Sequence, residues 1–291
     1  MTVDDSALTN EQIADAVNQS GFPLQLGLQR IVANSLDWKL PLVEHSWTDS
    51  LSIDPKFIDF VVSGKHKPWR LVVEAKRARS TEWIFLISKR GASQKFDVQA
   101  RAVSDTLPMN DWVRTYFLPL SHSASFCIVR KGNQYSQELL ERTAAELVRA
   151  TDALAEQETA ISGRAMNRAG QLGTLGQLDG IPATRLYFPV IVTTARLYVA
   201  IGDYDETDLA QGDLADIAGE EVSMVRFTKS LSAPPIVTPR APRAKDIRGL
   251  GQLAQRTVMV VQARHFSEFL GRWELKLDSA PDWLQNVDLL D

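Results

Sequence analysis

Two strand-like runs decide the fold of this chain: KFIDFVV at residues 56–62 and WRLVVEAK at residues 69–76. Both runs are rich in β-branched and aromatic residues, which favour β-strands. The segment GKHKP at residues 64–68 lies between them, and its glycine and proline are typical of a turn. We therefore predict two neighbouring antiparallel strands.

Each run carries charged residues where a buried strand should be apolar. Asp59 stands between large apolar residues, and Glu74 and Lys76 follow a Leu-Val-Val sequence. Because side chains at positions i and i+2 share one face of a strand, Glu74 and Lys76 should project together. Pairing through the turn would bring Asp59 beside Glu74. Buried charges are costly unless each finds a partner or a metal ion, so these residues are expected to act together.

This combination of residues favours a metal-dependent hydrolytic centre. Two converging carboxylates repel each other, and Mg²⁺ or Mn²⁺ relieves the repulsion by taking oxygen ligands. The expected ligands are Asp59, Glu74 and the backbone carbonyl of Ala75. Lys76 is expected to orient the attacking water or to stabilise charge on the phosphorane.

The pair Ile58-Asp59 followed by LVVEAK at residues 71–76 resembles the motif of the PD-(D/E)xK nucleases, the restriction-endonuclease-like superfamily. The family's proline before the aspartate is replaced here by Ile58. The sequence GFPLQ at residues 21–25 and the strand-like YFPVIVTT at residues 187–194 also fit the family pattern.

The resemblance implies an α/β fold with a mixed central sheet flanked by helices, in the order αβββαβ. It covers about residues 10–200, with an insertion at about 80–130, and says little about residues 201–291, which we expect to form a C-terminal β-rich elaboration. No linker separates two self-sufficient halves, so we expect residues 1–291 to form a single decorated domain.

The resemblance also implies a Mg²⁺- or Mn²⁺-dependent nuclease, most simply a DNA endonuclease in prokaryotic antiviral defence or DNA processing. DNA is expected as the substrate in preference to RNA. Cutting both strands of a duplex commonly needs two sites, which would suit a homodimer or a protein partner in a larger complex. A toxin-like RNase that acts only with a partner is a further alternative.

A catalytically inactive nuclease-like scaffold or regulatory subunit is the main alternative. Some relatives carry a carboxylate in the first helix near the metal, and the nearest residue here is the uncharged Gln25, a possible accessory residue that can accept a hydrogen bond from water. Glu44, on the preceding strand, could take its place as an accessory ligand, or could simply be a solvated strand end. The uncharged Gln25 favours the inactive alternative, and the intact Glu74-x-Lys76 opposes it.

Basic residues downstream of the centre are candidates for nucleic-acid binding. Arg77, Arg79, Lys89 and Arg90 could contact the phosphate backbone, although a solvated charged face explains them equally well. The formal net charge of −4 does not favour a general polyanion-binding surface, so any grip on nucleic acid must come from local patches.

Composition excludes several other classes of protein. The single cysteine, Cys127, rules out an intramolecular disulfide and is expected to be a buried core thiol. The four histidines lack metal-ligand spacing, so no zinc site is predicted. The acidic N-terminus lacks a signal-peptide core, and no apolar stretch reaches the roughly 20 residues of a membrane helix, so we expect a cytoplasmic protein without a membrane span.

The remaining patterns predict further elements. Helices are expected within residues 8–36, over 137–157 and over 266–270. Strands are expected over 112–118 and 125–130, around a loop with Pro119, over 185–201 with a turn near 194–196, and over 221–227 and 256–262. Loops are expected over 161–183 and 232–245.

Overall fold

The two runs form β2 (Lys56–Gly64) and β3 (Trp69–Lys76), and they pair antiparallel as predicted, with Ser63 opposite Arg70 and Phe60 opposite Val73. Strand β1 (Trp38–Trp47) pairs antiparallel with the outer side of β2. The computed structural model describes residues 7–48, 54–65, 67–89, 95–104, 110–136, 138–172, 184–203, 211–214, 216–231 and 254–276.

Strand β9 (Thr184–Thr193) continues the sheet in parallel beside β3, and all of its side chains are buried. Its continuous apolar sequence is typical of a strand covered on both faces. Strand β13 (Gln255–Gln262) lies parallel to β9, and β12 (Met224–Ser230) lies antiparallel to β13. The carboxyl ends of β3, β9 and β13 therefore meet at one edge of the sheet.

The other strands of this nine-stranded sheet curl back toward β9. They are β5 (Lys95–Ser104), β6 (Asn110–Ala124) and β14 (Glu274–Lys276). Strand β5 pairs with both β6 and β9, while β6 also pairs with β12. The pairings β9–β13–β12–β6–β5–β9 thus close a ring.

A second, five-stranded sheet has the order β11-β10-β4-β7-β8. Its strands are β4 (Thr81–Ser88), β7 (Phe126–Lys131), β8 (Gln134–Ser136), β10 (Arg196–Gly202) and β11 (Ile217–Val222). Strand β10 follows β9 after a short turn and runs parallel to β4, which follows β3. Strands β3 and β9, which pair with each other in the first sheet, are therefore each followed directly by a strand of the second sheet.

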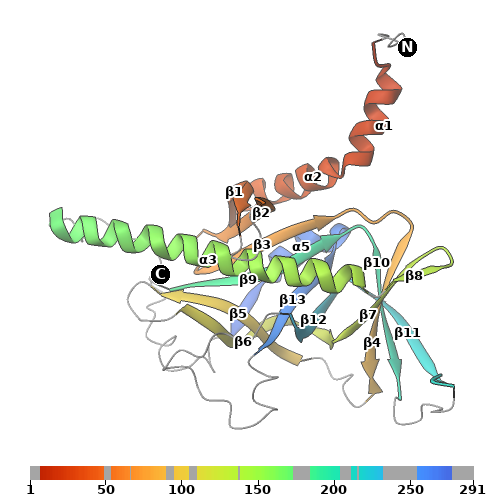
Figure 1. Ribbon diagram of the computed structural model, residues 1–291. Coiled ribbons are helices and arrows are strands. Elements are labelled where there is room, and N and C mark those ends of the chain that lie inside the picture. The colour runs from red at the N-terminus through yellow and green to blue at the C-terminus, as the bar shows by residue number, and fades with distance from the viewer. Residues whose placement is uncertain are drawn as a thin grey trace.

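Helices cover both faces of the larger sheet (Figure 1). Helix α2 (Phe22–Ala33) and α5 (Phe266–Gly271), the latter preceded by the 3₁₀ turn η4 (Ala263–His265), share one core cluster with Leu71 and Val73. The long α3 (Glu138–Leu172) covers the opposite cluster, which contains Val72. The predicted α/β class with mixed sheets flanked by helices is thereby confirmed.

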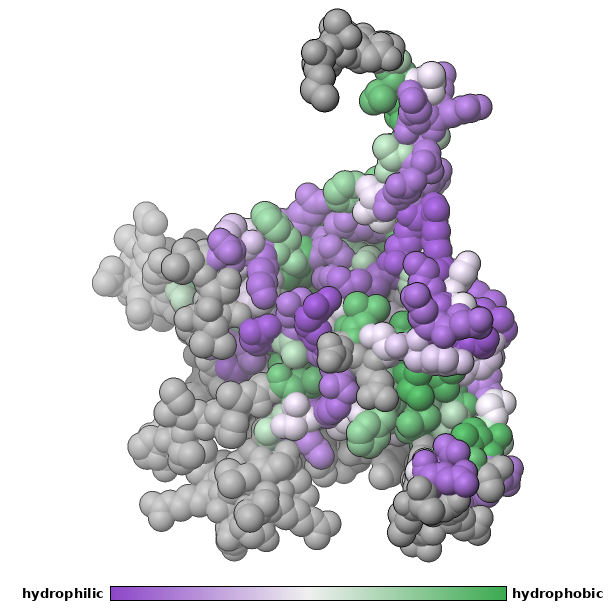
Figure 2. All heavy atoms as spheres, turned by 45° about the vertical axis from the view of Figure 1, so that its right-hand side comes forward, coloured by the Kyte–Doolittle hydropathy of each residue, from purple (hydrophilic) through white to green (hydrophobic). Residues whose placement is uncertain are grey.

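Helix α1 (Asn10–Ser20) extends away from the sheets and has no buried residue. A capping box of Thr9 and Gln12 begins it, and Gly21, in a left-handed conformation with φ of 87°, separates it from α2. Figure 2 shows this arm rising from the body with mostly hydrophilic side chains. None of the helices in the described part of the chain combines the length and the apolarity needed to cross a membrane.

Two predicted loops are wrong. Pro119 lies inside β6, where the pairing with β5 is irregular between Tyr116 and Ser121, so its missing N–H group disrupts no regular ladder. The expected loop at 161–183 is helical as far as Leu172, because good helix formers separate its glycines. Residues 173–183 and 232–245 lie outside the described residues.

The structure also tests two further predictions, one on a strand and one on the cysteine. The run predicted as one strand over 221–227 is divided at Ser223 between β11 and β12. The Cys127 thiol is 3% exposed, which confirms a buried core cysteine, and burial raises its pKa.

An aromatic cluster fastens the chain after β13 to the first face of the sheet. The ring centroid of Trp273 lies 4.9 Å from that of Phe188 and 5.4 Å from that of Phe269. The Trp38 indole nitrogen donates to the Leu270 carbonyl at 3.1 Å. Residues far beyond β9 therefore complete the core beneath β3.

Replacing Trp273 with alanine should lower the free energy of unfolding by about 3–5 kcal/mol, because a large buried ring would leave a cavity. Urea unfolding monitored by circular dichroism measures the change. Trp273→Phe keeps an aromatic ring and should cost clearly less. Equal stability of Trp273→Ala and the wild type would show that this cluster does not hold the C-terminal elements.

Candidate active site

Strands β2 and β3 separate where the predicted charged residues begin. Their backbone pairing ends at Phe60 and Val73, although the same register would place Asp59 opposite Glu74. At this point the Oδ2 atom of Asp59 accepts a hydrogen bond from the Ala75 backbone N–H at 2.6 Å. A side chain thus takes the place of a ladder hydrogen bond as the strands diverge.

The alternation of β2 also breaks at Asp59. Ile58 and Val61 both join the cluster beneath α3, whereas Phe60 joins the opposite cluster. On the adjacent strand, the register places Glu44 beside Asp59, and Glu44 has a left-handed φ of 47°. Such irregularities re-aim side chains. Here the Asp59 carboxylate is directed at the backbone of β3.

Glu74 and Lys76 project from the same face of β3, as strand alternation predicted. The Lys76 Nζ atom lies 2.5 Å from Glu74 Oε1, and the two side chains are 40% and 21% exposed, respectively. They stand at the carboxyl end of β3, beside the parallel β9. Ligands in α/β sheets commonly bind at the carboxyl ends of parallel strands.

Electrostatics couple the two carboxylates. Burial and the nearby Glu74 raise the pKa of Asp59 to about 6, while the Ala75 N–H and Lys76 act to lower it. Glu44 adds a smaller raising effect. The carboxylates of Asp59 and Glu74 are therefore close enough to repel each other, and Lys76 balances only part of their charge.

The donor set suits a divalent cation that keeps some of its water. Two carboxylates, the Ala75 carbonyl and water are the type of ligand that Mg²⁺ takes in proteins. Among the described residues, no group of three or more His, Cys, Asp or Glu side chains lies close enough to hold a metal ion. A cation at this place would therefore depend on Asp59 and Glu74, with Glu44 near but outside such a group.

The accessory residue Gln25 acts on the backbone. It is 7% exposed on α2, and its Nε2 atom donates to the Asp59 carbonyl at 3.1 Å. It therefore fixes the part of β2 that carries Asp59, a role that sequence analysis had not assigned to it.

The three basic candidates that the structure describes do not form one patch. Arg77 is half-buried directly after Lys76, and Arg79 donates to the Asn18 carbonyl at the end of α1. Lys89 forms an ion pair with Asp216 at 3.5 Å, beyond the far end of β4. At about 3.3 Å per residue, the length of β4 places Lys89 roughly 25 Å from the β3–β4 connection. Arg90 lies outside the described residues.

The backbone after Lys76 is held by Thr194 in the turn between β9 and β10. Thr194 N–H donates to the Lys76 carbonyl at 3.2 Å, and Thr194 Oγ1 accepts from Ala78 N–H at 2.8 Å. Rigid support of this kind fixes the position of a functional side chain.

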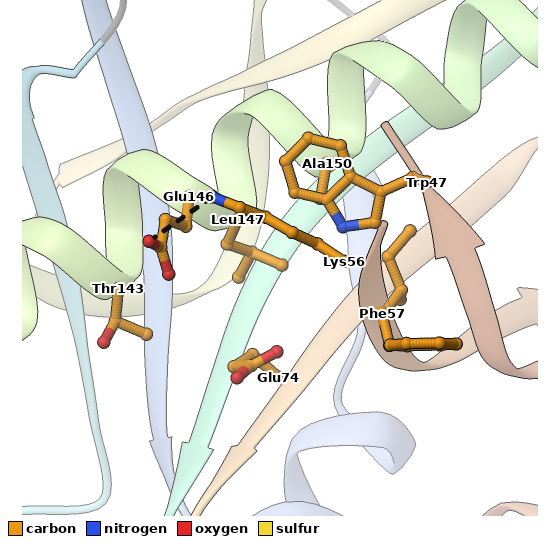
Figure 3. Close-up of a pocket in the computed structure, with 9 residues that line it drawn as sticks. Trp47, Lys56, Phe57, Glu74, Thr143, Glu146, Leu147 and Ala150 are labelled. Carbon is orange, nitrogen blue, oxygen red and sulfur yellow. Dashed lines mark ion pairs between the residues drawn. The ribbon is translucent and has the colours of Figure 1, made fainter. Parts of the chain in front are cut away.

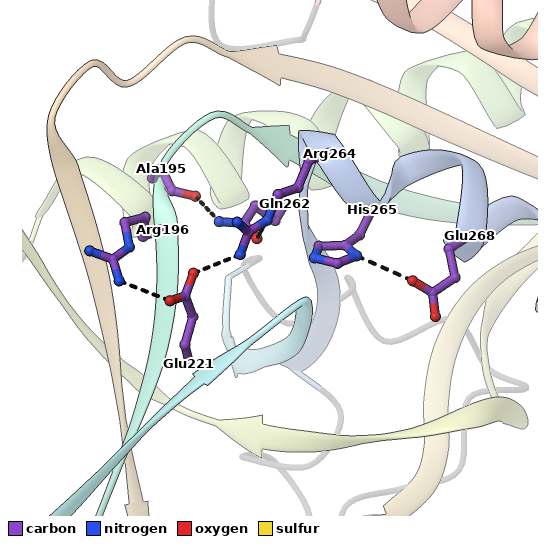
Figure 4. Close-up of polar contacts among 7 residues, drawn as sticks. All are labelled: Ala195, Arg196, Glu221, Gln262, Arg264, His265 and Glu268. Atoms are coloured by element: carbon purple, nitrogen blue, oxygen red, sulfur yellow. Dashed lines mark hydrogen bonds and ion pairs between the residues drawn. The ribbon is translucent and has the colours of Figure 1, made fainter.

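Polar contacts hold this turn against the end of β13 (Figure 4). Glu221 pairs with Arg196 at 2.9 Å and with Arg264 at 2.7 Å. The buried Gln262 side chain donates to the Ala195 carbonyl at 3.2 Å. These contacts hold the second sheet against one edge of the first sheet. It is the edge at which β3 ends with Lys76.

A cavity of about 270 Å³, which the sequence did not predict, lies next to Glu74 (Figure 3). On the strand side it is lined by Trp47, Lys56, Phe57, Ile58 and Glu74.

The opposite wall of the cavity belongs to α3 and consists of Thr143, Glu146, Leu147 and Ala150. Their spacing of three and four residues places them on one helix face. That spacing is visible in the sequence, but it does not distinguish a cavity wall from the ordinary polar flank of a helix that packs on the core.

A buried ion pair positions this helix on the sheet. Arg101 Nε lies 2.9 Å from Asp152 Oδ1, and the Trp112 indole donates to the same carboxylate oxygen at 3.0 Å. Because Asp152 lies two to nine residues beyond the wall residues on α3, this contact holds the adjoining part of the helix against β5.

In metal-free protein, Asp59→Asn should stabilise the fold by about 1–2 kcal/mol at neutral pH. The raised pKa of Asp59 means that the folded state holds its proton more tightly than the unfolded state, so stability is lost as pH rises from about 4 to about 6. The amide oxygen of asparagine can still accept from Ala75 N–H. The gain should therefore shrink as the pH is lowered toward 4.

Urea unfolding in EDTA across this pH range measures the effect, with the exposed Asp37→Asn as control. A loss of stability in Asp59→Asn at neutral pH would mean that the carboxylate is well compensated in the folded state.

No protein-family model matches this sequence, and comparisons with curated proteins and with solved structures give no match.

Proposed function

We propose that this chain is a Mg²⁺- or Mn²⁺-dependent phosphodiesterase of the PD-(D/E)xK type that cleaves DNA as an endonuclease. The observation that carries the proposal is the convergence of Asp59, Glu74 and Lys76. Asp59 is bonded to Ala75 N–H, Glu74 is paired with Lys76, and all three stand where β2 and β3 diverge.

The order of elements supports this proposal. Helix α2, strands β1, β2 and β3, helix α3 and strand β9 follow one another in the order αβββαβ, with β4 to β8 between β3 and α3. Strands β1 to β3 are antiparallel and β9 is parallel to β3. The order agrees with the αβββαβ order that the sequence resemblance implies and so supports the proposal, although fold alone does not establish activity.

Each residue has a distinct role in the proposed reaction. Asp59, Glu74 and the Ala75 carbonyl would hold the cation, which would polarise the phosphodiester and activate a water molecule. The Lys76 ammonium, held beside Glu74, would offer a hydrogen-bond donor and positive charge to the attacked phosphate. Gln25 would keep Asp59 in place through its carbonyl.

The positions of the basic residues favour a substrate that is bound close to the site over one that is bound across a broad basic surface. Lys76 and Arg77 are consecutive at the end of β3, whereas Lys89 lies at the far end of β4. Because Lys76 and Arg77 are the described basic candidates close to the site, DNA would be bound there through few phosphate contacts, and its affinity should depend only moderately on salt. A second copy or a protein partner could supply further contacts.

A nuclease-like module without catalytic activity is the second candidate. Its support is the direct Glu74–Lys76 ion pair, which occupies one ligand oxygen, and the absence of a third close carboxylate in the described part of the chain. Calorimetric titration with Mn²⁺ separates the two candidates, because a vestigial site should bind no cation.

Plasmid DNA, single-stranded DNA and RNA incubated with the protein in Mn²⁺ or Mg²⁺ test the proposal directly. Glu74→Gln and Lys76→Met should each lower the cleavage rate by about 100-fold or more, because each removes a group that acts on the transition state. Glu74→Gln should also weaken Mn²⁺ binding in the calorimeter.

The exposed Glu220→Gln and Lys131→Met are matched controls and should cleave like the wild type. Cleavage that persists in both site variants would point to a contaminating nuclease. A wild-type protein that binds no Mn²⁺ in the calorimeter and cleaves none of these substrates would favour the inactive module.

A further inference from the structure

The proposed reaction needs Glu74 but does not need the cavity that lies beside it. It lies between α3 and the strands β1, β2 and β3. In Figure 3, Glu74 faces the α3 side chains across the space, while Phe57 and Trp47 stand at one end of it. Since Glu74 belongs both to this cavity and to the proposed metal centre, one bound molecule could reach both.

The size of the cavity suits a single ring system. Its volume of about 270 Å³ is just below the roughly 300–1,000 Å³ of typical small-ligand sites. A base pair or a duplex end is too large for this space, whereas one heteroaromatic base is not.

The walls of the cavity offer an apolar and aromatic surface. Ile58, Leu147 and Ala150 supply the apolar part. Phe57 is 61% exposed at the cavity, an unfavourable place for a large aromatic side chain unless a ligand covers it. Aromatic side chains in such positions stack on nucleobases.

The polar groups of the cavity are mostly hydrogen-bond acceptors. The Glu146 carboxylate lies 3.6 Å from the Lys56 ammonium, and both side chains remain partly exposed. Thr143 donates its hydroxyl hydrogen to the Leu139 carbonyl, which leaves its oxygen as an acceptor. Glu146 and Thr143 therefore offer two acceptors and Lys56 one ammonium donor, a set that matches a base with an exocyclic amino group and a ring nitrogen or carbonyl oxygen.

We propose that this cavity binds one unpaired nucleobase that carries an exocyclic amino group, namely adenine, cytosine or guanine. The base would stack on Phe57 and donate to Glu146 and Thr143, while the phosphodiester of the same nucleotide lies at Glu74. The substrate class is then single-stranded or locally unpaired nucleic acid, because a stacked and paired base cannot enter. This inference rests on the proposed nuclease function.

Fluorescence anisotropy with short fluorescein-labelled homopolymers of dC, dA and dT tests the inference, in Ca²⁺ and again in EDTA. The protein should bind dC and dA more tightly than dT, which lacks an amino group. Phe57→Ala should weaken binding of dC about tenfold, since a stacking contact is lost. Phe126→Ala is the matched control, because Phe126 is also 61% exposed but lies on β7, away from the cavity.

A second pair of variants tests the polar contacts. Glu146→Gln should reduce the preference for dC over dT, whereas Glu156→Gln, at an exposed position of α3 outside the cavity, should leave it unchanged. Thermal unfolding of each variant establishes that it is folded.

The outcomes separate this inference from the proposed function. Binding that depends on Phe57, without cleavage of any homopolymer in Mn²⁺, supports the base site and overturns the hydrolytic activity. Cleavage that needs Glu74, with Phe57→Ala and Glu146→Gln equal to the wild type in affinity and rate, overturns the base site alone. Equal affinity of the wild type for dC, dA and dT also overturns it.

Discussion

The hydrogen bond between the Ala75 N–H and the Asp59 carboxylate is the contact on which the candidate site depends. When two paired strands separate, each loses backbone partners, and an orphaned buried N–H group costs about 1–3 kcal/mol. The carboxylate satisfies this donor and lets β2 and β3 diverge at their ends. The divergence in turn leaves room for Glu74 to face α3. The Asp59 side chain thus both replaces a backbone hydrogen bond and contributes a carboxylate to the candidate site.

The same arrangement creates an electrostatic conflict that the fold resolves only in part. Asp59 is held by Gln25 from below and repelled by Glu74 beside it, and Lys76 offers one compensating charge. Functional sites commonly keep such unfavourable interactions, because a ligand relieves them on binding. The conflict is confined to the beginning of β2 and the end of β3, and the adjoining residues 60–64 and 71–73 are buried, so the core bears little of its cost.

Much of this centre was predictable because it follows from local patterns. A short turn between two apolar runs fixed the antiparallel pairing, and the two-residue period of a strand placed Glu74 and Lys76 on one face. What could not be predicted depended on tertiary pairing. Lys89 follows the motif closely in sequence, but β4 leaves the first sheet to pair with β10 and carries this residue away. Glu146 lies far along the chain, and only the seating of α3 on the sheet brings it near Glu74.

Strand β9 has a consequence for how the molecule opens. It pairs with β3, β5 and β13, and its continuation β10 enters the second sheet. Strands β3, β5 and β13 therefore cannot detach without breaking hydrogen bonds to this one segment. The two sheets should behave as one cooperative folding unit, in which the amides of β9 exchange with solvent only when the whole structure unfolds, whereas those of the projecting α1 exchange by local fraying.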